Sequence, residues 1–390
     1  MKKIKMLIVA CLALCFAFMA VGCSNHVELQ RYVDVDERTL GYKLMGDGTF
    51  YLYNDGEYSE EWQDYEYDDT NDIVSERQWN DKLNSIKKAV IGDKISYVGE
   101  YTFCNAKSMT ELVIGADLEE MGANALKNCY NLSKITIDKN NTNFVLENGC
   151  LVHVATGTLI RAINQSEITV PSEVVTMEDG VFYGLKGVTK VDMSDTQIKV
   201  IENNSFRGCS SLQDVSLPGN ITSIGQYAFF RCTALKNVDL QNCEKLNKID
   251  VSAFFGCSSL KRIELPKSMK QIGMLAFSKS GLEQVYVPAT ESRLKVGSNA
   301  FYECNSLKEV YVHSMALLTS VKNNAEAGYL FANTYQAEKS GVNRHLKIFI
   351  QSSEFDTEKL GAYIANDKNF VRLSDTETVN GVEYVVYKGL

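Results

Sequence analysis

The chain has 390 residues, of which 45% are hydrophobic and 23% charged, with a formal net charge of −9. This composition is typical of a folded protein with a sizeable core and not of a disordered chain. Because phosphate binding requires a basic face, the acidic balance predicts no nucleic-acid partner.

Residues 1–22 have the pattern of a secretion signal. Three early lysines precede an apolar stretch, residues 6–21, that is too short for a comfortable bilayer span. The stretch ends in Ala20-Val21-Gly22-Cys23 and resembles the bacterial lipobox, although Ala20 stands where Leu is usual. The resemblance implies acylation of Cys23, so we expect a chain secreted across the cytoplasmic membrane and lipid-anchored at the bacterial cell surface.

Residues 23–78 form an acidic, tyrosine-rich segment. Within it, residues 41–53 alternate around a Gly-Asp-Gly turn and predict a hairpin. Residues 57–72 offer carboxylates to Ca²⁺ or a basic partner, but they lack the spacing and central glycine of an EF-hand. A solvated, flexible segment is the favoured interpretation, since like charges repel one another.

Residues 79–312 repeat one phrase, seen most clearly as Ala-Phe-Phe-Arg-Cys-Thr-Ala-Leu at 228–235. A phenylalanine marks the phase and returns every 23 to 25 residues at 182, 206, 229, 254, 277 and 301. Each repeat ends in a strand-like alternation, after which all four prolines of the chain occur. The Ala-Phe pair is expected on a short helical or 3₁₀ piece, and stacked repeats bury one continuous core.

Two regions depart from the repeat. Residues 143–161 contain two apolar runs broken by Ala-Thr-Gly and predict a hairpin inserted into one repeat. Residues 313–390 are expected to cap the last coil, with strands at 346–350 and 382–387 and a short helix at 357–365.

The repeat resembles the BspA-type bacterial leucine-rich repeat, Ile-Gly-x-x-Ala-Phe-x-x-Cys-x-x-Leu-x-x-Val-x-Leu-Pro, over about residues 86–312. The resemblance implies an α/β fold, a right-handed leucine-rich repeat solenoid with short parallel strands on its concave face, capped at both ends. Such repeats occur in secreted and surface-attached bacterial proteins. The match weakens at Leu126, at the insertion and at residues 278–281.

Five cysteines share one repeat phase, three residues after the phenylalanine or its substitute. A small buried hydrophobe explains that phase better than a disulfide or a metal does, so we expect reduced thiols. These are Cys129, Cys209, Cys232, Cys257 and Cys304.

No catalytic or cofactor motif occurs in the sequence. The four histidines lack metal-ligand spacing, and there is no phosphate-binding loop, nucleophile elbow or His-Glu-x-x-His. We therefore predict no catalytic residues, no metal and no cofactor.

The outward residue between the two core positions of each strand is the most informative surface position. It is acidic in the middle of the solenoid and aromatic near its end, which predicts a binding face. The candidates are Asp192, Asp239, Glu264, Tyr286, Tyr311 and Phe349. The alternative for the aromatic members is that residues 313–390 cover them as a cap.

These features predict a non-enzymatic cell-surface binding protein, an adhesin for a protein or polysaccharide on a host or neighbouring cell. The adhesion role rests mainly on the family resemblance, because a fold does not establish a ligand. The alternative is a cell-envelope scaffold or a glycan-capture lipoprotein that serves a neighbouring transport or enzyme system.

Overall fold

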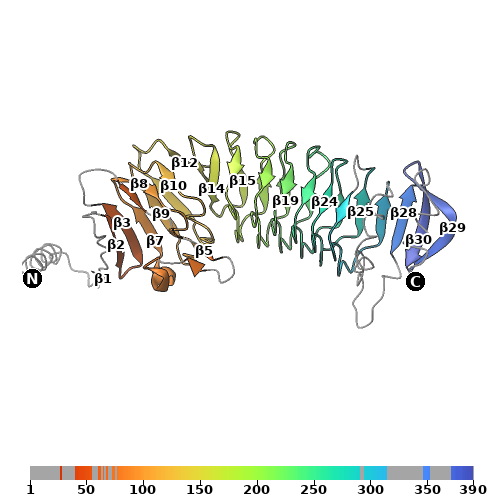
Figure 1. Cartoon of the computed structure of the whole chain (residues 1–390), viewed down its shortest axis with the longest axis horizontal. Helices are drawn as coiled ribbons and strands as arrows, with labels where there is room; N and C mark the ends of the chain where they lie inside the picture. Colours follow the sequence, from red (N-terminus) through yellow and green to blue (C-terminus); the bar gives the residue numbers. More distant parts are fainter. Residues whose placement is uncertain are drawn as a thin grey trace, which may run out of the picture.

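A computed structural model describes residues 27–28, 40–54, 60–62, 65, 67–68, 73–74, 77–289, 294–313, 346–351 and 370–389. These residues confirm the expected repeat solenoid, with about ten coils stacked along one axis (Figure 1). The signal, Cys23 and the helix expected at 357–365 lie outside the described residues. Within the described part, no helix has the length and apolar character that crossing a membrane requires.

Each regular coil contributes one longer and one shorter strand, and equivalent strands pair in parallel one repeat apart. The longer strands form three successive ladders, which are interrupted between β11 and β15 and between β21 and β23. They are β7 (Lys88–Ile91), β9 (Glu111–Ile114), β11 (Lys134–Ile137), β15 (Glu167–Thr169), β17 (Lys190–Asp192), β19 (Asp214–Ser216), β21 (Asn237–Val238), β23 (Arg262–Glu264), β25 (Gln284–Val287), β27 (Glu309–Val312) and β28 (Lys347–Gln351). We call their outward side the long-strand face.

The shorter strands form a second set of parallel ladders on another side of the coils. Each one carries the isoleucine, valine or methionine that precedes the Ala-Phe segment, with that side chain buried or half-buried. They are β8 (Ile95–Val98), β10 (Glu120–Met121), β16 (Thr176–Met177), β18 (Val200–Ile201), β20 (Ser223–Ile224), β22 (Lys248–Ile249), β24 (Gln271–Ile272) and β26 (Lys295–Val296).

The repeated phenylalanines stack through the centre of the solenoid. From Phe182 to Phe301, successive rings are nearly parallel with centroids 4.6 to 5.3 Å apart, and all six side chains are buried. This phenylalanine ladder runs along the solenoid axis and supplies much of the apolar contact between coils.

The Ala-Phe segments form consecutive turns, so the expectation of a short helical piece is wrong. Alternate N–H groups leave the segment: Phe229 N–H donates to the Ala253 carbonyl at 2.7 Å, and Arg231 N–H donates to the Phe255 carbonyl at 2.8 Å. The N–H groups between them bond locally, as Phe230 does to the Tyr227 carbonyl at 3.1 Å. Hydrogen bonding to the next coil competes with the helical pattern and prevails over it.

The insertion forms two hairpins that share a strand, where the sequence predicted one. Strand β12 (Phe144–Glu147) pairs antiparallel with β13 (Cys150–His153), which pairs antiparallel with β14 (Thr158–Ala162). The additional reversal is at Asn148-Gly149, where both residues have positive φ angles of 49° and 78°. The insertion lies where the buried residues divide into two apolar clusters.

On one side of the insertion, a buried arginine supplies hydrogen-bond donors to turn carbonyls that would otherwise accept from a preceding coil. In regular coils, the carbonyls before and after the ladder phenylalanine accept N–H groups of the preceding coil. At Phe182, Arg161 Nη2 donates to the Tyr183 carbonyl at 3.2 Å, and Ala162 N–H donates to the Val181 carbonyl at 3.1 Å. Arg161 Nη1 also donates to the Gly180 carbonyl at 2.8 Å. The guanidinium therefore takes the place of a missing coil.

Arg77 has the same role at the start of the solenoid. Its Nη1 donates to the carbonyls of Thr102 at 3.1 Å and Cys104 at 2.9 Å, the residues on either side of Phe103. On the other side of the insertion, the Asn124 N–H has no carbonyl of a next regular coil to bond. Glu178 Oε2 accepts this N–H instead, at 3.1 Å.

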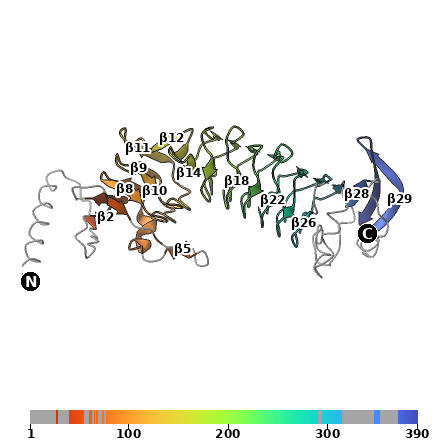
Figure 2. The ribbon, with the colours of Figure 1, turned by 45° about the horizontal axis from the view of Figure 1, so that its top comes forward.

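The first and the last of the three long-strand ladders each end in a hairpin (Figure 2). At the start, β2 (Leu40–Met45) and β3 (Thr49–Asn54) form the predicted hairpin, and β3 pairs in parallel with β7. At the end, β30 (Val382–Gly389) pairs antiparallel with β28 and with β29 (Phe370–Val379). The domain boundaries at residues 78 and 312 stay predictions.

Part of the acidic segment is ordered, so the expected flexibility is wrong there. Strand β4 (Glu60–Trp62) pairs in parallel with β8, and the buried Tyr65 packs edge-on against Trp79 with ring centroids 5.7 Å apart. The first coil leaves a strand edge and an apolar end that require covering, and β4 and Tyr65 cover part of them.

Candidate functional site

The six sequence-predicted residues fall into two groups on the long-strand face. Glu264, Tyr286, Tyr311 and Phe349 occupy equivalent positions of four consecutive strands. Asp192 ends β17, and Asp239 directly follows β21. The interruption between β21 and β23 separates the two groups, so they do not form one continuous row.

Asp192 and Asp239 each close a turn as well as carrying charge. The Asp192 carboxylate accepts Ser194 N–H at 3.0 Å and its hydroxyl at 2.7 Å, and these hydrogen bonds lower the pKa of Asp192. Asp239 accepts Gln241 N–H at 3.1 Å. Ser194 and Gln241 stand where other repeats have proline. An aspartate therefore forms the turn where no proline restricts the backbone.

Glu264 is the third acidic candidate. Its Oε2 lies 3.1 Å from Arg262 Nη2, and its side chain is 25% exposed. Because Arg262 is itself 61% exposed, this ion pair is solvated and leaves the carboxylate within reach of a partner.

Of the two interpretations of the aromatic row, coverage by the cap holds for Tyr311 and Phe349, and exposure does not. They are 8% and 2% exposed, and their rings stack with centroids 4.6 Å apart. Strand β30 places Tyr384 edge-on to both rings, with centroids at 5.6 and 6.0 Å. The physical reason is that the last coil requires a cover, so these two candidates are cap contacts.

Tyr286 lies at the edge of the same cap and is half-buried. Its hydroxyl is 3.2 Å from the Tyr384 hydroxyl, which is 2.8 Å from His313 Nε2. The ring centroids of Tyr286 and His313 are 4.9 Å apart. Tyr286 therefore keeps some exposure but contributes mainly to the cap.

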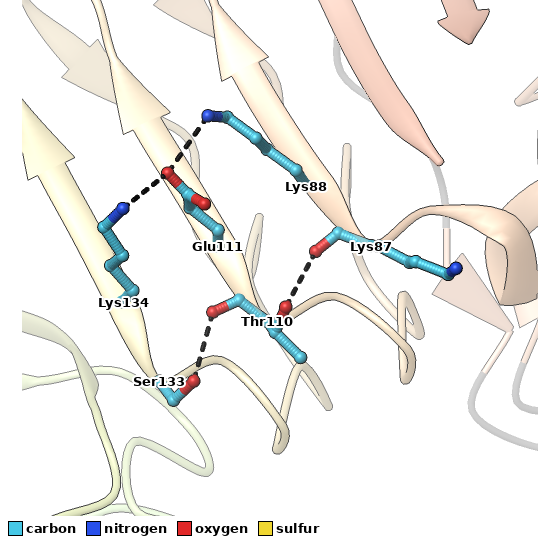
Figure 3. A network of polar contacts seen from close by, with 6 residues as sticks. All are labelled: Lys87, Lys88, Thr110, Glu111, Ser133 and Lys134. Atoms are coloured by element: carbon cyan, nitrogen blue, oxygen red, sulfur yellow. Dashed lines mark hydrogen bonds and ion pairs between the residues drawn. The ribbon is translucent and has the colours of Figure 1, made fainter. Parts of the chain in front are cut away.

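The sequence did not single out ladders of alternating charge on the long-strand face. Glu111 pairs with Lys88 at 3.0 Å and Lys134 at 3.1 Å, while Thr110 and Ser133 donate to the carbonyls of the preceding coils (Figure 3). Side-chain hydrogen bonds from the two lysines lower the pKa of Glu111. Glu283 makes a similar pair of contacts with Lys261 and Lys308, at 3.3 and 2.7 Å, one residue before the strands begin. The signal was present as opposite charges one repeat apart.

The predicted burial of the five in-phase cysteines is confirmed, and all eight cysteines of the described part are buried and unpaired. Their reduced state stays a prediction. Burial raises the pKa of Cys209 to about 12 and that of Cys304 to about 11. The described residues contain no group of three or more potential metal ligands.

A second surface was missed by sequence reasoning. Except for the buried Ser278, the residue after each ladder phenylalanine is half-buried, and several of these residues are aromatic or arginine. Six residues at and near these positions form a surface that we call the turn-face strip. They are Tyr183, Arg207, Tyr227, Phe230, Arg231 and Phe255. Their recurrence beside the phenylalanine phase was the available signal.

The stacked coils, parallel ladders and terminal hairpins define a repeat-solenoid protein. The family model for the BspA type leucine-rich repeat region matches residues 74–150, 160–248 and 243–359 in six copies. The chain therefore belongs to the BspA type leucine-rich repeat family. The match omits residues 151–159, which lie within the insertion.

Several solved bacterial proteins are similar to the chain. The leucine-rich repeat protein of T. pallidum is 24% identical over 43% of this chain and 77% of its own, with a TM-score of 0.35. A leucine-rich repeat protein from Eubacterium ventriosum is 20% identical over 72% and 95%, with a TM-score of 0.34. The pneumococcal vaccine antigen PcpA is 14% identical over 86% and 97%, with a TM-score of 0.40. No curated protein matches the sequence.

Proposed function

We propose that this protein is a secreted, lipid-anchored and non-enzymatic surface protein that binds a protein or polysaccharide on a host or neighbouring cell. Membership of a leucine-rich repeat family supports a binding role, because solenoids present extended, rigid faces to their partners. The signal-like segment at residues 1–22 supports secretion. The Ala-Val-Gly-Cys sequence at residues 20–23 supports a lipid on Cys23.

The observation that carries the proposal is the acidic middle of the long-strand face. Asp192, Asp239 and Glu264 are exposed or half-buried on coils whose register is fixed by the phenylalanine ladder. A partner would therefore meet preorganised carboxylates, and it would not have to order flexible loops.

The test combines Asp192→Asn, Asp239→Asn and Glu264→Gln in the mature chain. Asparagine keeps the oxygen that accepts the turn N–H, so the fold is preserved while the charge is removed. Binding to intact cells and to a panel of matrix proteins and glycans should weaken about tenfold or more, equivalent to about 1.4 kcal/mol or more. The thermal midpoint should hardly move.

The matched control is Glu119→Gln, Glu120→Gln and Glu173→Gln, three exposed acids outside the long-strand face. It makes the same change in net charge. If both triple variants bind like the unmodified chain, the acidic middle is not the binding surface. Equal losses in both would show that net charge, and not this face, controls binding.

Anchoring has a separate test. Mass spectrometry of the mature N-terminus should find a lipid on Cys23, and Cys23→Ala should release the protein from cells into the medium. An unmodified N-terminus at another residue would contradict the anchor while leaving the binding proposal intact.

A further inference from the structure

The turn-face strip is built from half-buried aromatic rings on adjacent coils. Phe230 and Phe255 stack with centroids 5.0 Å apart and planes within 11°, and Tyr227 packs edge-on against Phe230 at 5.5 Å. Unlike the fully buried ladder phenylalanines beside them, these side chains keep part of their surface in solvent. The strip therefore presents ring surface along the solenoid axis.

Two guanidinium groups cover these rings. Arg207 Cζ lies 5.7, 5.3 and 5.2 Å from the ring centroids of Tyr183, Tyr227 and Phe230, and Arg231 Cζ lies 5.3 Å from that of Phe230. The side-chain partner of Arg207 is neutral, since its Nη1 donates to Asn204 Oδ1 at 3.1 Å. Over the described ranges, no carboxylate forms an ion pair with either arginine.

An unneutralised pair of arginines is notable in a chain whose net charge is −9. Lys279, which stands at the position of Arg231 two coils further on, is paired with Glu303 at 3.3 Å. A guanidinium stacked on a ring keeps its edge of N–H donors available for a planar oxyanion. The strip therefore has the chemistry of a site for an anionic ligand.

The backbone of the strip favours a sugar polymer over a peptide. The N–H groups of Phe229 and Arg231 already donate to the next coil, so they are not available to an added peptide strand. Recognition is left to the solvent-exposed parts of the rings and to the guanidinium edges. Exposed ring surface packs against the C–H groups of sugars, and guanidinium edges bind acidic substituents.

We propose that the turn-face strip binds an acidic polysaccharide. Arg207 and Arg231 bind its carboxylate or sulfate groups, and the solvent-exposed parts of Phe230 and Phe255 contact the C–H groups of its sugar rings. This surface is separate from the long-strand face, so the inference does not depend on the binding role proposed for Asp192, Asp239 and Glu264.

The experiment titrates the mature chain with polygalacturonate, heparin, neutral dextran and polyglutamate. Polygalacturonate or heparin should bind more tightly than dextran and polyglutamate. Arg207→Gln with Arg231→Gln should weaken that binding about tenfold or more, whereas Lys199→Gln with Lys245→Gln, an equal loss of exposed charge, should leave it nearly unchanged. Arg207→Lys with Arg231→Lys tests whether the planar group is required, and it should also bind more weakly.

Three outcomes would overturn the inference. They are no binding to either acidic polysaccharide, equal losses in the arginine and lysine variants, and polyglutamate binding as tightly as the polysaccharides. If the double arginine variant unfolds, the single variant Arg231→Gln, at an exposed position, takes its place in the test. It should still weaken polysaccharide binding several-fold. The Asp192, Asp239 and Glu264 triple variant should bind the polymer normally, which separates failure of this inference from failure of the long-strand proposal.

Discussion

The repeated cysteine performs a hydrogen-bonding task that an aliphatic residue of similar size cannot. Cys232 Sγ lies 2.9 Å from the Phe206 carbonyl, and Cys209 Sγ lies 2.9 Å from the Phe182 carbonyl. A thiol is small enough for the core and also supplies a weak donor. The same contact to the carbonyl of a preceding coil recurs at Cys129, Cys257 and Cys304, at 3.1, 3.1 and 3.0 Å.

Cys232→Ala should therefore destabilise more than the loss of one small apolar group would. We expect a cost of about 1 to 2 kcal/mol, because the Phe206 carbonyl loses the thiol donor inside the core and keeps only the Cys209 N–H. Cys232→Ser restores a donor and should recover part of the loss. Urea unfolding of both variants measures the difference, and equal stability of the alanine variant and the parent would contradict the hydrogen-bonding role.

The thiols should also be protected from chemical modification. Burial raises the pKa of Cys209 to about 12, which suppresses the reactive thiolate at neutral pH. A thiol-specific reagent should leave the ladder cysteines unmodified in the native chain and label them after unfolding. Peptide mapping identifies them, and a disulfide between any two would refute the prediction.

The ladder phenylalanines couple each coil to its neighbours. The Phe229 ring stacks between those of Phe206 and Phe254, at 4.8 and 4.9 Å. Phe229→Ala should cost about 3 to 5 kcal/mol, because it removes a large buried side chain shared by three coils. The control is the adjacent, half-buried Phe230→Ala, which should cost less. Chemical denaturation compares them, and similar midpoints would contradict the assignment of Phe229 to the core.

The insertion introduces a pH-sensitive group. Burial raises the pKa of Glu178 to about 8. The hydrogen bond from the Asn124 N–H lowers this pKa, and the nearby charges of Asp179 and Glu100 raise it further. The folded chain then holds a proton that the unfolded chain loses near its ordinary pKa of about 4.3. The contribution of Glu178 to stability should be greatest below that value and should fall as the pH rises toward about 8.

Glu178→Gln should remove this fall in stability, because its side chain has no proton to lose in this range. Unfolding free energies measured at pH 5 and pH 9 should differ less in the variant than in the parent. The exposed Glu173→Gln is the control and should keep the parental slope. An unchanged slope in Glu178→Gln would assign the pH dependence to another group.

For the molecule as a whole, the C-terminal hairpin determines which part of the long-strand face remains available. Tyr384 and Val386 on β30 cover Tyr311 and Phe349, and all four form a buried cluster. Asp192 and Asp239 lie away from this cover, whereas Glu264 is the strand neighbour of Tyr286 at its edge. The available binding face is therefore shorter than the strand count suggests.

Tyr286→Ala combined with Tyr311→Ala should loosen the C-terminal cap. The double variant removes the stacking on Phe349 and the hydroxyl contact to Tyr384, so its thermal midpoint should fall. When folded, it should bind ligand as the parent does. An unchanged midpoint with abolished binding would instead return these tyrosines to the binding surface.

The repeat period, the parallel strands, the proline-closed turns and the buried cysteines were all predictable from the sequence. Each follows from a pattern of near neighbours that recurs every 23 to 25 residues. The position of the acidic candidates on the long-strand face follows from the same alternation. What these side chains bind remains a prediction.

Other features were decided by contacts between segments far apart in the chain. Tyr286 and Tyr384 are 98 residues apart, and only the return of β30 to β28 turns an exposed aromatic row into a cap. Arg161 has the pattern of an ordinary strand residue until the insertion places its guanidinium over the carbonyls of the next coil. Local spacing determines which residues point inward. Pairing between distant segments decides which outward residues are covered and which buried charged groups find hydrogen-bond partners.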